Sequence, residues 1–211
     1  IALAASVDAY DTDRIRRHEF TRPQKENDRV RQIEALDAQT GPVLLAHRPS
    51  LDVATLVARL SAGTPEDDLV ADDGIAHSIW VVREAADIAA ITEAFEAMPT
   101  LYIADGHHRS AAASRVTAAK RADNPDHRGD EPYNYFLAVA FPSDALQVFD
   151  YNRVVRDLNG LEASAFLARV QAAFSVEESA EAVAPAGPGE YGMYLDGKWY
   201  RLAIQPTLVP E

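Results

Sequence analysis

Hydrophobic positions along the chain follow two spacings, one typical of strands and the other of helices. Short apolar or alternating runs predict strands at 43–47, 75–82, 101–104, 133–141, 146–151, 191–195 and 199–204. Three- and four-residue apolar spacing predicts helices from Pro23 to about Leu36 and at 50–60, 85–98, 110–121 and 164–174. Strands and helices mix without strict alternation, so we expect an α+β fold with a mixed sheet and packed helices.

The pattern also suggests how the chain divides. Residues 180–189 contain two prolines and two glycines, which favours a linker. Beyond it, Asp196-Gly197 lies between two aromatic and β-branched runs, as in a two-residue hairpin. We therefore expect an α+β core domain at 1–179 and a small C-terminal β unit, a hairpin at 190–211 packed on the core. The sequence opens at Ile1 rather than methionine, and we expect the core to be a fragment of a longer chain.

Charge and composition exclude several classes of protein. The 211 residues carry 20 Lys and Arg against 33 Asp and Glu, a net charge of -13, so we expect no nucleic acid as partner. The absence of cysteine excludes disulfides, thiolate catalysis and zinc–thiolate sites. No apolar run approaches the roughly 20 residues of a membrane span, so we expect no membrane partner and a cytoplasmic location.

The segment 103–110 carries the most chemical information. A predicted strand ends at Asp105, Gly106 allows a tight turn, and a helix opens at His107-His108-Arg109. The first amides of a helix lack intrahelical partners and the helix dipole adds positive charge, so an anion is favoured there. Gly106 lets the backbone approach a ligand closely, and Arg109 offers a fork of donors for phosphate or carboxylate.

Each of these residues also has a simpler interpretation. Asp105 can cap the helix, or act as a base or a metal ligand. His107 and His108 diverge by about 100° on a helix, which makes them a poor chelating pair. One of them can instead remain a neutral hydrogen-bonding group, since the positive helix end disfavours its protonation.

Two further polar clusters are candidates for a site. His18-Glu19 lies in extended chain before the first helix and suits an acid–base pair, with Lys25 and Arg29 following; a solvated helix with internal ion pairs is the alternative. The second cluster, 150–153, lies at the end of a predicted strand and is interpreted either as part of a site or as an ordinary loop. The Walker A, G-x-G-x-x-G, H-E-x-x-H and G-x-S-x-G motifs are all absent.

Several of these strings resemble one family over nearly the whole chain. The strings, of which D-G-H-H-R is the most specific, are 17–19, 25–29, 39–42, 102–109, 133–135 and 150–153. The chain is similar to the family of proteins with domain of unknown function 1015. Its D-G-H-H-R turn is more distantly similar to the G-x-H-R box of the ParB/sulfiredoxin-like superfamily, which includes free-serine kinases.

This resemblance implies a function and a set of roles. It implies a ParB/sulfiredoxin-like core that binds phosphate, with Glu19 as the base. The further catalytic groups that it implies are His18, Asp105 and His107. The residues around the phosphate are Gly106, His107, His108, Arg109 and Ser110. The supporting residues are Lys25, Arg29, Asn152 and Arg153.

We therefore expect a phosphate- or nucleotide-binding enzyme. The specific expectation is phosphotransfer to a small hydroxyl substrate such as serine, with ATP or ADP and with Mg²⁺ held by Asp105. Two alternatives remain open: a non-catalytic module that binds a nucleotide or anion and regulates a partner, and a metal-dependent hydrolase. The partner is a small phosphorylated molecule or nucleotide in the first two cases, and the oligomeric state stays open.

Overall fold

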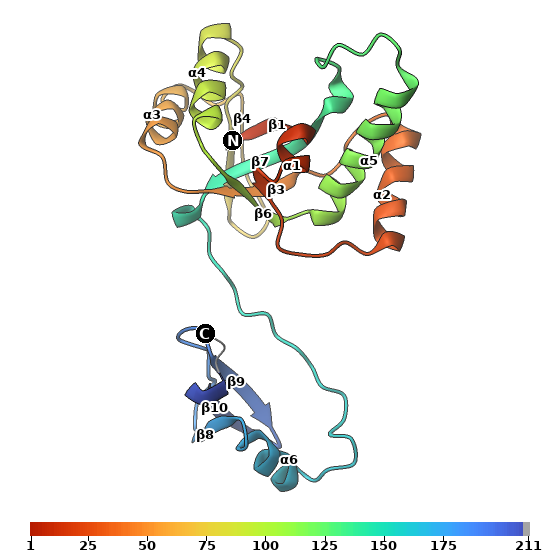
Figure 1. Ribbon diagram of the computed structural model, residues 1–211. Helices are drawn as coiled ribbons and strands as arrows, with labels where there is room; N and C mark the ends of the chain where they lie inside the picture. The colour runs from red at the N-terminus through yellow and green to blue at the C-terminus, as the bar shows by residue number, and fades with distance from the viewer. Residues whose placement is uncertain (209–211) are drawn as a thin grey trace. The chain divides into compact units, whose positions relative to one another are not determined.

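The computed structural model describes residues 1–208, which form two compact units (Figure 1). Residues within Ile1–Gln147 contact mainly one another, and so do those of Val148–Glu211. Each unit is described by itself below.

The first unit is built on a five-stranded mixed sheet. Its strands, in the order β1-β7-β3-β6-β2, are β1 (Ala2–Ser6), β7 (Tyr135–Pro142), β3 (Val43–His47), β6 (Leu101–Asp105) and β2 (Ile15–Arg16). β7 pairs antiparallel with β1 and parallel with β3, while β6 pairs antiparallel with β3 and parallel with β2. The predicted α+β class and mixed sheet are thus confirmed.

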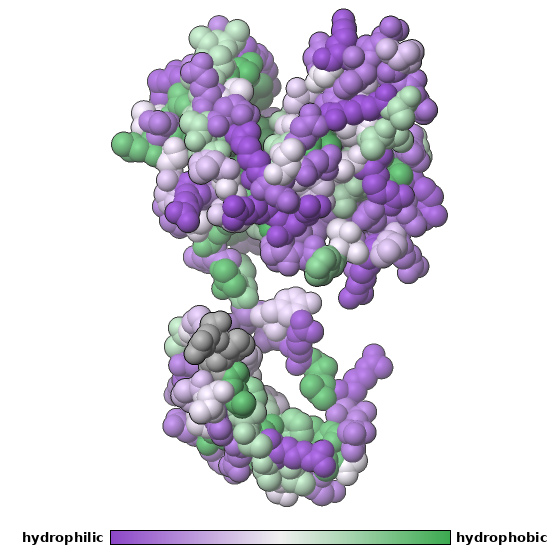
Figure 2. All heavy atoms as spheres, in the orientation of Figure 1, coloured by the Kyte–Doolittle hydropathy of each residue, from purple (hydrophilic) through white to green (hydrophobic). Residues whose placement is uncertain are grey.

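Four helices contribute to one apolar core, namely α1 (Val7–Asp11), α3 (Leu51–Leu60), α4 (Ala85–Glu96) and α5 (His107–Asp123), whereas α2 (Pro23–Leu36) contributes no buried residue to it. The core joins Val53 of α3, Phe95 of α4 and Ala113 of α5 to alternate residues of the strands, such as Leu45 and Phe136. Figure 1 shows α2 and α5 side by side, and their polar outer surface dominates that part of the face seen in Figure 2.

Local sequence explains where these helices begin. Ser50 caps α3 by accepting the Val53 N–H, and Pro23 occupies the first turn of α2 after Arg22, as predicted. α2 has no buried residue, which agrees with its thin apolar stripe. It is therefore held to α5 by polar contacts as much as by packing, including the Glu26–Arg115 ion pair at 2.8 Å.

A separate two-stranded hairpin, β4 (Asp67–Val70) and β5 (Ala76–Ile79), follows α3. It turns through the Asp72-Asp73-Gly74 segment, where Gly74 has φ 81°. Within the described chain, β4 and β5 pair only with each other. All eight of their residues are exposed.

The second unit is a three-stranded antiparallel sheet with one helix. β10 (Lys198–Ile204) lies between β9 (Glu190–Leu195) and β8 (Phe174–Ser179), and α6 (Ala163–Val170) precedes them. The predicted Asp196-Gly197 hairpin is confirmed, with both residues at positive φ. Residues 180–189 join β8 to β9 inside this sheet, so β8 belongs to the second unit, whereas the sequence placed it with the core.

One predicted strand is absent, and one strand–helix pair was not predicted. Residues 146–151 are not a strand, because β7 already has β1 and β3 on its two edges and offers no free edge to a hairpin partner. The sequence analysis did not predict β1 and α1, in which the side chain of Ser6 caps the helix by accepting the Ala9 N–H. Within residues 1–208, every helix is too short or too polar to cross a lipid bilayer.

Candidate functional site

The turn between β6 and α5 has the geometry that the sequence predicted. Gly106 has φ 102°, a conformation that L side chains rarely adopt. A Cβ on Gly106 would lie 3.2 Å from the Val43 Cα and 3.1 Å from Nε of Arg109. Glycine is therefore required here both by the backbone angle and by the close approach of β3.

The first turn of α5 leaves amide groups available to a ligand. The N–H groups of Arg109 and Ser110 both donate to the Gly106 carbonyl, at 2.9 and 3.0 Å. The N–H groups of His107 and His108 have no acceptor anywhere in residues 1–208. Together with the helix dipole, these two amides favour an anion at this point.

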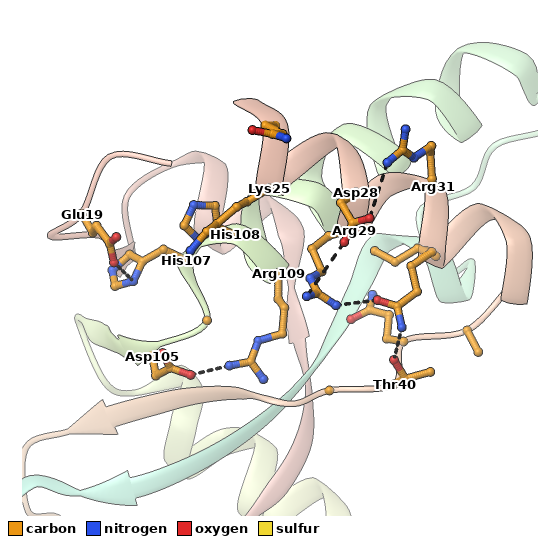
Figure 3. Close-up of a pocket in the computed structure, with 17 residues that line it drawn as sticks. Glu19, Lys25, Asp28, Arg29, Arg31, Thr40, Asp105, His107, His108 and Arg109 are labelled. Carbon is orange, nitrogen blue, oxygen red and sulfur yellow. Dashed lines mark hydrogen bonds and ion pairs between the residues drawn. The ribbon is translucent and has the colours of Figure 1, made fainter. Parts of the chain in front are cut away.

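A cleft of about 860 Å³ opens in front of this turn. Its walls come from α2, α5, the segment around Glu19, and the loop 38–41 (Figure 3). Four cationic side chains line it against three carboxylates, although the chain as a whole carries a charge of -13. These are Lys25, Arg29, Arg31 and Arg109 against Glu19, Asp28 and Asp105. The cleft is thus a local cationic exception on an acidic protein, which favours a small anionic ligand.

Arg109 faces this cleft but is already bonded to the protein. Its guanidinium donates to the Pro42 carbonyl and to the Asp105 carboxylate, four residues earlier on the chain. It lies between two glycines, since a Cβ on Gly41 would be 3.3 Å from Nη1 and one on Gly106 3.2 Å from Nη2. Asp105 therefore forms an ion pair instead of capping α5, for which the structure shows no side-chain cap.

His107 is buried, with 4% of its surface exposed, and joins α5 to the segment around Glu19. Its Nδ1 lies 3.5 Å from Oε2 of Glu19, and its Nε2 accepts the His18 N–H at 3.4 Å. The His18 ring meets the His107 ring edge-on at 4.4 Å between centroids. Burial is the main cause that lowers the pKa of His107, and with the neighbouring His18 it outweighs Glu19 and Asp105, which raise that pKa. His107 is thus a neutral imidazole that donates toward Glu19.

His108 fixes the same segment one residue further along α5. Its Nε2 accepts the Arg22 N–H at 3.0 Å, at the N-terminus of α2. The two histidines therefore position the chain from residue 18 to residue 22 against the first turn of α5. They diverge on the helix as predicted, and neither faces the other as a chelating pair would.

The cations of α2 are held only by their helix neighbours. Arg31 lies 3.4 Å from Asp28, and Arg29 donates to Gln32 at 2.7 Å. Lys25 has no ion pair or hydrogen bond among the described residues. Figure 3 shows Lys25 and Arg29 extending from α2 toward the first turn of α5.

Four of the predicted site residues do not line this cleft, and one of them is His18, whose ring packs against that of His107. Ser110 is fully buried and donates its hydroxyl to the His107 carbonyl at 3.1 Å, so it supports the turn from behind. Asn152 and Arg153 belong to the second unit, which is described separately. Among residues 1–208, no group of three or more His, Asp or Glu side chains is arranged to hold a metal ion.

The loop 38–41 was not predicted as part of the site. Gln39, Thr40 and Gly41 line the cleft, and Gln32 and Gln24 complete the α2 side. The sequence offered one signal, since Gln39-Thr40-Gly41-Pro42 is among the strings that carry the family resemblance. The resemblance assigns no site role to the residues of that string.

Comparison with known proteins decides the family. The model of the family described as protein of unknown function (DUF1015) matches residues 1–210. The chain belongs to the DUF1015 family. Neither a curated protein nor a solved structure matches the sequence, so the more distant ParB/sulfiredoxin-like resemblance stays a prediction. DUF1015 membership gives the cleft no assigned activity, and its chemistry has to be argued from its residues.

Proposed function

We propose that the protein binds the phosphate groups of a small phosphorylated molecule or nucleotide in the cleft between α2 and α5. The observation that carries this proposal is the cluster of four cations in front of the two free amides of His107 and His108. Phosphate suits both features, because it accepts several charge-assisted hydrogen bonds at once. A nonspecific electrostatic attraction is a weaker explanation, since the chain as a whole is acidic.

The proposed reaction is transfer of the terminal phosphoryl group to a small hydroxyl substrate such as serine. Glu19, whose side chain is 56% exposed, takes the hydroxyl proton while that oxygen forms its bond to phosphorus. The bond from phosphorus to the leaving phosphate of the nucleotide breaks, and the cations of α2 stabilise the developing charge. His107 orients Glu19 through its Nδ1–H, and because it is neutral it leaves the carboxylate free to accept the proton.

Magnesium fits this proposal only as an ion that enters with a nucleotide. The Asp105 carboxylate is paired with Arg109, and the described residues offer no three-ligand group of their own. Mg²⁺ commonly binds through substrate phosphates and one or two carboxylates, so Asp105 alone does not build a site for it. The same observation leaves the metal-dependent hydrolase without support from this part of the chain.

The second candidate function is a non-catalytic binding module. It is favoured by the way His107, His108 and Arg109 are all engaged by protein groups, which is typical of a rigid recognition surface. In that case the cleft binds the anion as proposed, but Glu19 serves to hold the first turn of α5 in place.

Glu19→Gln separates the two candidates. We expect the variant to bind ADP and pyrophosphate as the native protein does, because its amide keeps the shape of the side chain. Phosphoryl transfer from ATP or ADP to serine should fall by about 100-fold or more, as expected for loss of a general base. Binding is measured by calorimetry with and without Mg²⁺, and transfer by the appearance of radiolabelled phosphoserine.

The matched control is Glu34→Gln, an exposed glutamate of α2 outside the cleft, which should leave both binding and transfer unchanged. Binding without transfer in the native protein would select the non-catalytic module. Absence of any phosphate or nucleotide binding would refute the proposed function altogether.

A further inference from the structure

A second hollow, of about 660 Å³, adjoins the cationic cleft. The two share three lining residues, Ile33, Ala38 and Gln39, at the C-terminal end of α2 and the loop after it. A ligand that fills the cleft can therefore extend past Gln39 into the second hollow without leaving the surface of the first unit.

The chemistry of this second hollow differs from that of the cleft. Aliphatic side chains of β1, α5 and β7 line it, together with the rings of Tyr133 and Tyr135. Its two charged residues, Asp37 and Lys120, form an ion pair with each other. A ligand with only phosphate and hydroxyl groups would leave these apolar walls in contact with water, whereas a flat apolar group would cover them.

The walls of the hollow are fixed without a ligand. The Tyr133 hydroxyl accepts from Nδ2 of Asn124 and bonds Nδ1 of His127, each at 2.9 Å. The Gln39 side chain donates to the Tyr135 carbonyl at 3.1 Å and accepts the Leu137 N–H at 2.9 Å. The ring of Tyr133 and the side chain of Gln39, which lines both hollows, are therefore held in place before a ligand arrives. This lowers the entropic cost of binding.

We infer that the ligand of this protein is a nucleotide whose base occupies the second hollow while its phosphates lie in the cleft. This rests on the proposed function, since it assigns the phosphates to the cationic cleft. It goes further by selecting a nucleotide over a sugar phosphate or an inorganic phosphate. The base lies among the aliphatic side chains and against Tyr135, a residue that is 38% exposed and lines the hollow.

Calorimetric titration of the full chain with ADP and with pyrophosphate tests this inference. Both probes present two linked phosphates, but only ADP carries a base. We expect ADP to bind the native protein more tightly than pyrophosphate does. Tyr135→Ala should weaken ADP by about 2- to 10-fold, the usual range for loss of one aromatic contact, and leave pyrophosphate unchanged.

Tyr102→Ala is the matched control. Tyr102 is a strand tyrosine of nearly equal exposure, 37%, and lines neither hollow. It should alter neither affinity. Leu137→Ala, at a residue that is also 37% exposed and lies on the wall of the second hollow, supplies an independent variant if Tyr135→Ala does not fold, as judged by circular dichroism.

The outcomes separate this inference from the proposed function. If pyrophosphate binds as tightly as ADP, or if ADP affinity survives both variants, the second hollow is not a base site, and the phosphate cleft still stands. If neither probe binds, the inference fails together with the proposed function.

Discussion

On the α5 side of the cleft, the polar side chains are bonded to segments far away in the sequence, whereas the arginines on the α2 side are bonded only to their helix neighbours. His107, His108 and Arg109 reach backbone groups 89, 86 and 67 residues away. Arg29 and Arg31 bond to Gln32 and Asp28 on their own helix. The α5 side is therefore part of the fold, while the α2 side is a solvated set of charges. Substitutions on the first side should affect stability and binding together, and substitutions on the second only binding.

The largest expected effect is that of Gly106→Ala on the α5 side. The alanine must adopt φ near 102° and bring its Cβ to 3.2 Å from the Val43 Cα. We expect the free energy of unfolding to fall by about 2–4 kcal/mol, and phosphate binding to be lost with the turn. Urea denaturation measures the first effect and calorimetry with pyrophosphate the second.

Gly74→Ala is the control for this experiment. Gly74 also has positive φ, 81°, but a Cβ there meets nothing within 4 Å. It should cost only the backbone strain, about 1–2 kcal/mol, and leave binding intact. Equal destabilisation by the two alanines would show that the approach of β3 to the turn is unimportant.

An intermediate effect, on binding alone, is expected for Lys25→Ala on the α2 side. Lys25 forms no ion pair within residues 1–208, so its removal should change the free energy of unfolding by less than about 0.5 kcal/mol. Loss of one charged contact to phosphate should weaken pyrophosphate binding about 10-fold. Arg48→Ala, which makes the same change in net charge at an exposed position outside the cleft, should have no effect on binding. A large loss of stability in Lys25→Ala would contradict the proposed difference between the α5 side and the α2 side of the cleft.

The smallest effect concerns the pH dependence contributed by His107. Because burial lowers the pKa of this histidine, the unfolded chain takes up a proton before the folded protein does as pH falls. The contribution of His107 to stability is therefore complete above its unfolded pKa of about 6.5 and declines as pH falls below it, by at most about 1.4 kcal/mol per pH unit. Comparing urea denaturation at pH 7.5 and 5.5 should show a smaller loss in His107→Gln than in the native protein. An identical loss in both would mean that folding does not lower the pKa of His107.

Local signals predicted the turn of the site but not the contacts around it. The strand–glycine–helix pattern at 103–110 depends on backbone conformation, which neighbouring residues determine, and Gly106 forms the predicted tight turn. The pairings of Arg109 with Pro42 and of His108 with Arg22 join segments that only the folded sheet brings together. For the same reason the burial of Ser110 was missed, since a single hydroxyl near a helix start looks identical whether it faces solvent or the core.

The fold shows the same division between local and long-range information. Helix bounds set by caps, such as Ser50 for α3, were predictable, because the capping interaction lies within four residues. Whether an apolar run becomes a strand depends on a free partner, and 146–151 has none in β7. The exposed apolar side chains after β7, among them Val148 and Phe149, are typical of strands in composition but are not paired within the described chain.

Gln39 has a consequence for the chemical ageing of the protein. Its amide takes the place of a neighbouring main chain on β7, donating through Nε2 and accepting through Oε1. Hydrolysis of that amide to a carboxylate would set an acceptor opposite the Tyr135 carbonyl and remove that hydrogen bond, while the bond from the Leu137 N–H would remain. A chemical change that adds no bulk would thus weaken the attachment of the Gln39 side chain to β7.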